Sequence, residues 1–103
     1  MRAILHGDVT AAARVLLLRP PEARAGFIRR LLSEADGADR YRKRTGRAHP
    51  HWGNGSLMAA ALKYEAAPEP FLSDRDYAEC MVIVLEAIIA RRLCSAAAGG
   101  KDC

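Results

Sequence analysis

The sequence has few aromatic residues and no segment in which β-branched or aromatic residues alternate cleanly with polar ones. Aromatic residues make up 6% of the 103-residue chain, so the alternation that marks a half-buried strand is missing and a β-sheet has little support. Half of the residues are nevertheless hydrophobic, which favours a folded chain. Because the good helix formers Ala, Leu, Arg and Glu are abundant, we expect an all-α domain.

Long hydrophobic runs are also missing. Near the N-terminus, Asp8 and Arg14 interrupt the apolar residues, whereas a secretion signal needs an apolar stretch of roughly 7–15 residues. The longest apolar candidate, residues 80–90, contains Glu86 and is shorter than the roughly 20 residues of a membrane-spanning helix. We therefore predict a cytoplasmic protein with no secretion signal and no membrane span.

Only three cysteines are present, Cys80, Cys94 and Cys103. Their odd number and their spacing match neither a disulfide framework nor a zinc-binding pattern. If Cys80 and Cys94 share one helix, they lie roughly 21 Å apart, well beyond the roughly 7 Å between Cα atoms that a disulfide allows. Reduced thiols are the simplest interpretation.

Apolar residues that recur every three or four positions predict four helices, at about residues 8–19, 21–45, 56–66 and 73–94. Asp8 is the expected N-cap of the first helix, which Pro20 should end. Pro21 suits the start of the second helix, and Gly46 suits its end. Gly37 could bend or shorten that helix, but we favour a continuous one. The two prolines predict that the first two helices form an antiparallel hairpin.

The third and fourth helices each begin after a capping residue. Asn54 or Ser56 is the expected cap of the short third helix, and Ser73 followed by Asp76 resembles a capping box. Residues 80–90 of the fourth helix are apolar on nearly every face. A helix with this pattern is expected either at the buried centre of the domain or in a dimer seam.

Charge is unevenly distributed along the chain. Residues 1–47 carry 11 Lys or Arg and five Asp or Glu, whereas residues 48–90 carry two and six. The basic part could attract an acidic partner. It could equally face the acidic part within the fold or across a dimer, so the net charge of +4 does not decide between these interpretations.

The most distinctive segment is residues 40–56, RYRKRTGRAHPHWGNGS, in which a dense basic run precedes the only Trp. The basic residues could contact phosphates through counterion release, and Trp52 could stack on bases. Alternatively, two of these cations lie four residues after an aspartate, Asp36 or Asp39, which is the spacing of a helix ion pair. The candidate partner- or phosphate-binding residues are Arg40, Arg42, Lys43, Arg44, Arg47, His49, His51 and Trp52.

Other motifs in this segment are weak. His49 and His51 could bind a metal, but no Cys lies at a useful spacing for the four-ligand sets of structural zinc. Residues 53–56 resemble a phosphate-binding glycine loop, yet they lack the Gly-Lys-Ser/Thr ending and a preceding strand. We favour a turn and helix cap here, with Trp52 folded back over the core. The connection of about ten residues is too long for a helix-turn-helix.

No catalytic set is recognisable in the sequence. Cys80 lies in an apolar helix, where a thiol is inert, and the serines lack the context of a nucleophile elbow. We therefore expect no enzyme activity, no cofactor and no metal.

The stretch ADRYRKRTGRAHPHWGNGSLMAAAL, followed by PEPFLSDRDY, resembles a set of short alphaproteobacterial proteins of unknown function. The resemblance covers most of the chain. It implies a bacterial, cytoplasmic protein with a single domain, and it assigns no catalytic or binding residues.

Together these patterns predict a compact all-α bundle of four helices, with a helical hairpin, a short helix and a long buried C-terminal helix. Residues 1–94 form the expected single domain, and residues 95–103 form a disordered tail. The favoured function is a small non-catalytic protein-interaction domain, adaptor or regulatory, with a homodimer through the fourth helix as a further expectation. The alternative is a nucleic-acid-binding accessory protein that uses the basic 40–56 segment.

Overall fold

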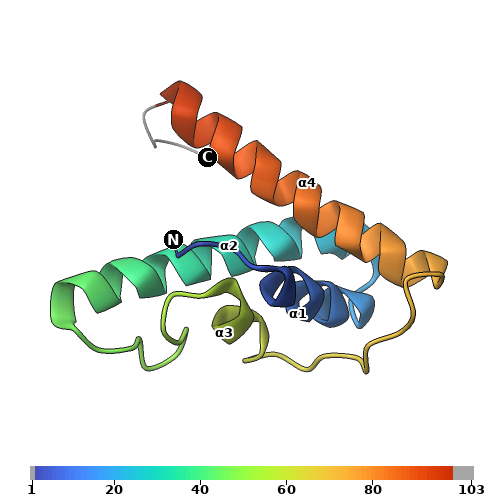
Figure 1. The fold of residues 1–103 in the computed structure, drawn as a ribbon, viewed down its shortest axis with the longest axis horizontal. Helices are drawn as coiled ribbons and strands as arrows, with labels where there is room; N and C mark the ends of the chain where they lie inside the picture. Colours follow the sequence, from blue (N-terminus) through green and yellow to red (C-terminus); the bar gives the residue numbers. More distant parts are fainter. Residues whose placement is uncertain (1, 99–103) are drawn as a thin grey trace.

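The computed structural model of the protein describes residues 2–98 and contains four helices (Figure 1). They are α1 (His6–Leu17), α2 (Pro21–Thr45), α3 (Leu57–Ala61) and α4 (Arg75–Ala98). No strand occurs in this part of the chain. The prediction of an all-α fold is therefore confirmed.

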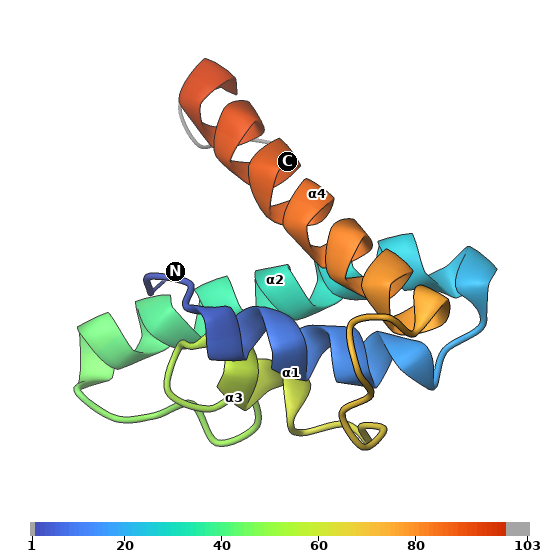
Figure 2. The same ribbon diagram turned by 45° about the vertical axis from the view of Figure 1, so that its right-hand side comes forward.

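Helices α1 and α2 form the expected antiparallel hairpin (Figures 1 and 2). Pro21 occupies the first position of α2, where its missing N–H costs no hydrogen bond. Gly46 ends the helix in the left-handed conformation, with a φ of 76°, which a glycine adopts without steric strain. Both predicted ends of α2 are confirmed, and Gly37 does not break the helix.

The central helix of the fold is α1, not α4 as the sequence predicted. The short, alanine-rich α1 contacts each of the other three helices, because small side chains let neighbours approach from several directions. Among the hydrophobic residues of α4 up to position 92, only Tyr77, Cys80 and Val84 are buried, whereas Val82, Leu85 and Ile89 are 46–57% exposed.

The difference in helix length explains why α1, and not α4, is the central helix. Helix α1 has 12 residues and α4 has 24, which correspond to roughly 18 Å and 36 Å at about 1.5 Å per residue. Figures 1 and 2 show that α4 packs on the hairpin near its N-terminal end and then leans away from it. The second half of α4 therefore has no α1 to cover it.

Asp8 does not cap α1 in the way the sequence suggested. The helix begins earlier, at His6, and Leu5 is its N-cap residue. Asp8 Oδ2 accepts a hydrogen bond from Leu5 N at 2.7 Å, and its Oδ1 accepts one from Met58 N at 2.9 Å. The buried Asp8 carboxylate therefore joins the start of α1 to the start of α3.

Helix α3 is shorter than the predicted span of 56–66 and ends at Ala61. The residues that follow Ala61 form hydrogen bonds with α1 and α2 instead of continuing the helix. The Tyr64 hydroxyl donates to Glu34 on α2 at 3.0 Å, and Ala67 exchanges two hydrogen bonds with Arg14 on α1, at 3.0 and 2.8 Å. These tertiary hydrogen bonds hold the chain in an extended path, so the helix does not continue.

Helix α4 begins and ends later than predicted. Asp74, rather than Ser73, accepts a hydrogen bond from the amide of Tyr77, at 3.0 Å, because the helix starts at Arg75. Its helical backbone reaches Ala98, beyond the end expected near Cys94. Residues 99–103, the rest of the expected tail, lie outside the described residues.

Arg24 ties the hairpin to α4. The residue is only 4% exposed, and its Nε donates to the carbonyls of Leu16 and Arg19 at 2.9 and 3.1 Å. Its two terminal nitrogens form a fork on the Asp76 carboxylate, at 2.7 and 3.2 Å. One side chain thus binds the C-terminal end of α1 and the first turn of α4.

We expect the replacement Arg24→Met to destabilise the fold. Methionine retains an apolar stem but removes the hydrogen bonds to both carbonyls and leaves Asp76 without its cation. The free energy of unfolding should fall by about 2–4 kcal/mol, measured by urea denaturation followed by circular dichroism. The exposed Arg29→Met on the same helix should change it by no more than about 0.5 kcal/mol. Equal losses in the two variants would contradict the role assigned to Arg24.

The stability should also depend on pH through Asp76. Its hydrogen bond from Arg24 holds the pKa of the carboxyl below its usual value. Because the folded pKa is the lower one, the stabilisation is complete above the unfolded pKa and is lost as the pH falls through the folded pKa. The difference in unfolding free energy between the wild type and Asp76→Asn should therefore be constant near neutral pH and shrink below about pH 4. A difference that does not change with pH would refute this linkage.

Candidate functional site

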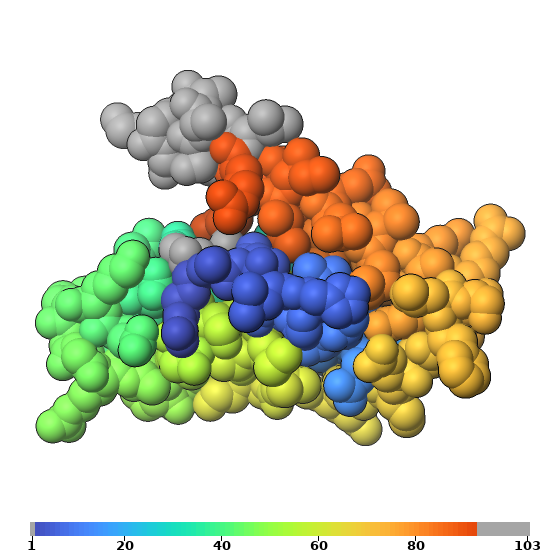
Figure 3. Space-filling model, viewed as in Figure 1, coloured from blue at the N-terminus to red at the C-terminus, as the bar shows by residue number. Residues whose placement is uncertain are grey.

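The predicted 40–56 segment comprises the end of α2 and the loop that leads toward α3. Figures 1 and 3 place it at one end of the molecule, with the start of α4 at the other. It therefore forms a surface of its own, which we call the basic loop surface and define as residues 40–56.

The loop is held in shape by His49. Two hydrogen bonds join the backbones of His49 and Gly53, at 2.8 and 3.2 Å. The His49 Nδ1 accepts from the amides of His51 and Trp52, at 3.0 and 3.1 Å. His49 thus bonds the loop backbone.

Trp52 is fixed by the ring of His49 in the loop and by the surface of α2 at Gly37. Its indole lies parallel to the His49 ring, with ring centroids 4.5 Å apart and an interplanar angle of 8°. Tyr41 meets the same imidazole edge-on, at 5.0 Å. A Cβ at Gly37 would lie 2.9 Å from the indole, so only glycine leaves room for the ring at this point of the helix. Trp52 remains 36% exposed.

The loop joins α3 through the predicted turn and cap. Gly55 has a φ of 100°, and its backbone lies so close to α2 that a Cβ would be 2.8 Å from the Cα of Asp39. The Ser56 hydroxyl accepts from Ala59 N at 3.1 Å, and Asn54 Oδ1 accepts from Ser56 N at 3.1 Å. Those amides are already bonded, which argues against a phosphate site at this helix end.

Two of the basic residues are paired with acids on their own helix. Arg40 lies 3.5 Å from Asp36, and Lys43 lies 3.1 Å from Asp39. These are the predicted pairs four residues apart, and such exposed pairs contribute little to stability. They account for two of the five cations in the run.

Arg42, Arg44 and Arg47 have no ion-pair partner within the described part of the chain. All three are exposed, and the Arg44 guanidinium lies 5.7 Å from the centre of the Tyr41 ring. The basic loop surface therefore displays three unpaired cations beside the fixed aromatic stack.

The acidic residues at the start of α4 do not neutralise this surface. Asp76 binds Arg24, Glu79 binds Arg75 at 3.1 Å, and Asp74 caps the helix. The charge asymmetry of the sequence is therefore not cancelled by contact between these acids and the basic run. Farther along α4, Arg91 adds a second cation to Asp36, at 3.2 Å.

One supporting residue was not recognised from the sequence. Gly37 was considered only as a possible bend. In the structure it lies against the Trp52 indole. The available signal was the cost of about 1 kcal/mol that a glycine carries inside a helix, which calls for a packing reason at that position.

The described residues were compared with the requirements of a reactive thiol and of a metal site. Cys80 is fully buried, and burial raises the pKa of its thiol, so the reactive thiolate is disfavoured. Among residues 2–98, no three His, Cys, Asp or Glu side chains converge on a position for a metal ion. Each helix in this part of the chain is too short or too polar to span a bilayer.

Gly37 should be required for the position of Trp52. An alanine in a helix normally stabilises it by about 0.5–1 kcal/mol relative to glycine, and Gly26→Ala on α2 should do so, because its nearest neighbour would lie 3.8 Å away. Gly37→Ala should instead destabilise the protein by about 1–2 kcal/mol and shift the emission of the single tryptophan. Similar stabilisation by both substitutions, with unchanged emission, would disprove the close contact.

Comparison with known proteins gives one match. Residues 2–88 match the domain family of unknown function DUF7742. A search of curated proteins and a search of solved structures each returned no match. The matched region contains the whole basic loop surface and agrees with the resemblance to proteins without an assigned activity. The chain belongs to the DUF7742 family.

Proposed function

We propose that the protein is a non-catalytic interaction domain whose basic loop surface binds an acidic segment of a partner protein. The observation that carries this proposal is the combination of three unpaired arginines with a fixed, partly exposed Trp52. Arg and Trp are the residues most enriched at the energetic centres of protein interfaces.

The fixed loop favours binding because its backbone and the Trp52 indole are already ordered before a partner binds. The hydrogen bonds around His49 set the loop backbone, and Gly37 with His49 sets the indole. Association therefore restricts mainly the arginine side chains, which lowers the entropic cost of binding. The arginines would attract an acidic partner, and Trp52 would supply apolar contact.

A protein partner fits this surface better than a nucleic acid does. His49 covers one face of the Trp52 indole at 4.5 Å, and that face is therefore closed to a stacking base. Helix α3 has five residues, LMAAA, without the Arg, Asn or Gln side chains that read base edges. Nucleic-acid binding through the arginines alone is the alternative that the experiment below distinguishes.

Self-association through α4 and a cytoplasmic location belong to the same proposal. Val82, Leu85 and Ile89 lie three and four residues apart and are exposed, so they form one uncovered apolar stripe. That stripe is consistent with a dimer seam, which light scattering across a concentration series would detect.

A pair of substitutions should separate the two kinds of partner. Arg44→Ala with Arg47→Ala should weaken binding of a labelled Asp/Glu-rich peptide about tenfold or more, measured by fluorescence anisotropy. Trp52→Ala should weaken it comparably. Arg29→Ala with Arg92→Ala removes the same charge elsewhere and is the matched control.

A labelled oligothymidylate is the second probe, measured over a range of salt concentrations. We expect it to bind more weakly than the peptide and to lose its affinity steeply with salt. Tighter binding of the oligonucleotide, with a salt slope reduced by the Arg44 and Arg47 substitutions, would favour the nucleic-acid function. An equal loss of affinity in the control pair, Arg29→Ala with Arg92→Ala, would show that binding depends only on the net charge of the protein.

A further inference from the structure

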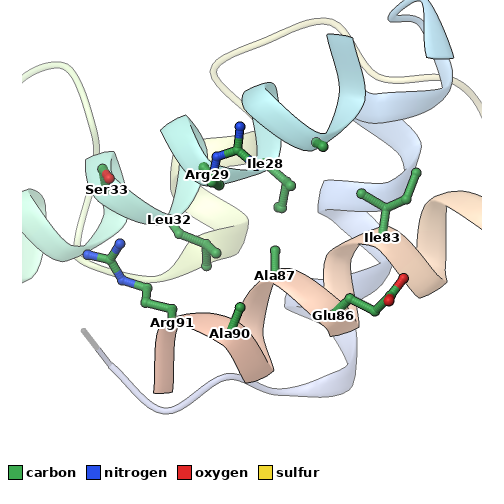
Figure 4. A pocket seen from close by; sticks show the side chains of 10 residues that line it. Ile28, Arg29, Leu32, Ser33, Ile83, Glu86, Ala87, Ala90 and Arg91 are labelled. Atoms are coloured by element: carbon green, nitrogen blue, oxygen red, sulfur yellow. The ribbon is translucent and has the colours of Figure 1, made fainter. Parts of the chain in front are cut away.

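A groove runs between α2 and α4 on a part of the molecule distinct from the basic loop surface. It has a volume of about 460 Å³, which lies within the roughly 300–1,000 Å³ of small-molecule sites. Its base is formed by the buried Ile28 and Leu32 of α2, and Ile83 and Ala87 of α4 line the facing wall (Figure 4).

Small side chains and one ion pair keep the groove open. Ala25 and Ser33 on α2 and Ala87 and Ala90 on α4 line it, and none of them is large enough to fill the space between diverging helices. At one end, Arg91 reaches across from α4 to Asp36 on α2, at 3.2 Å. The pair joins the two helices at that end of the opening.

The polar groups of the lining are arranged along the groove. Figure 4 shows Arg91 and Ser33 at one end and Glu86 with Ile83 at the other. Arg29 lies on the α2 rim, is exposed, and has no ion-pair partner in the described residues. The lining of the groove therefore combines an apolar base with the unpaired Arg29, the Ser33 hydroxyl and an Arg91 that is already paired with Asp36, and Glu86 lies at the far end.

We propose that this groove binds a small amphipathic anion, namely an unbranched hydrocarbon chain with a carboxylate head. The head would lie against Arg29, whose unpaired guanidinium can bind a carboxylate together with the Ser33 hydroxyl one turn along α2. The chain would lie over the apolar base, where it is removed from water. The unpaired charge of Arg29 selects an anionic occupant over an uncharged apolar molecule.

The test uses sodium decanoate and octanoate with the full-length protein, below the concentrations at which they form micelles. Calorimetric titration should show one site, with decanoate bound about tenfold more tightly because it buries two more CH₂ groups. Arg29→Gln should weaken decanoate binding about tenfold. Arg92→Gln, an exposed arginine of α4 outside the lining, is the matched control and should bind as the wild type does.

A second variant tests the location of the site. Ala90 is exposed at the groove wall, so Ala90→Trp fills the space without disturbing the core and should abolish binding. Circular dichroism checks that the variant is folded, and light scattering with and without decanoate reports the oligomeric state.

Three results would overturn the proposal. The first is no binding of decanoate at millimolar concentration, and the second is unchanged binding by a folded Ala90→Trp. The third is a wild-type dimer that Ala90→Trp converts to a monomer, because a second copy would then occupy the groove.

Discussion

The position of α4 depends on the buried guanidinium of Arg24. Helix α1 is followed by two prolines, which have no N–H to donate to its last carbonyls. Arg24 supplies donors in their place and binds the carbonyl of Leu16 in α1 and that of Arg19 in the turn that follows. The same group holds Asp76, so the turn that ends α1 also fixes where α4 starts.

Anchoring α4 at its first turn has consequences for the rest of that helix. The helix is twice as long as α1, so it extends beyond the core and leaves the apolar side chains of Val82, Leu85 and Ile89 in contact with solvent. The groove opens between α4 and α2 and is closed at one end by the Arg91–Asp36 pair. Asp36 also binds Arg40, and it therefore lies at the boundary between the groove and the basic loop surface. A single helix, α2, carries both surfaces, with the groove along its first half.

The features predicted correctly from the sequence are those set by neighbouring residues. Pro21 and Gly46 define α2, and Ser56 caps α3, because each acts within one turn of chain. The predictions were wrong where residues far apart in the sequence determine the burial or the end of a helix. Residues 80–90 of α4 are apolar on nearly every face, yet their burial depends on the length of α1, which no local pattern in α4 contains. Likewise, α3 ends early because distant partners on α1 and α2 bind Tyr64 and Ala67.

The contact between Gly37 and Trp52 shows why the candidate site was only partly predictable. The sequence identified the basic run and the tryptophan, but it could not show that a glycine 15 residues earlier makes room for the indole ring. Once the ring is placed on α2, its stacking on His49 follows, and Tyr41 meets His49 from the helix. The arginines around it are long side chains that retain their freedom. In such a surface the shape is set by the aromatic stack, whereas the attraction is set by the cations, so affinity and specificity can be altered separately.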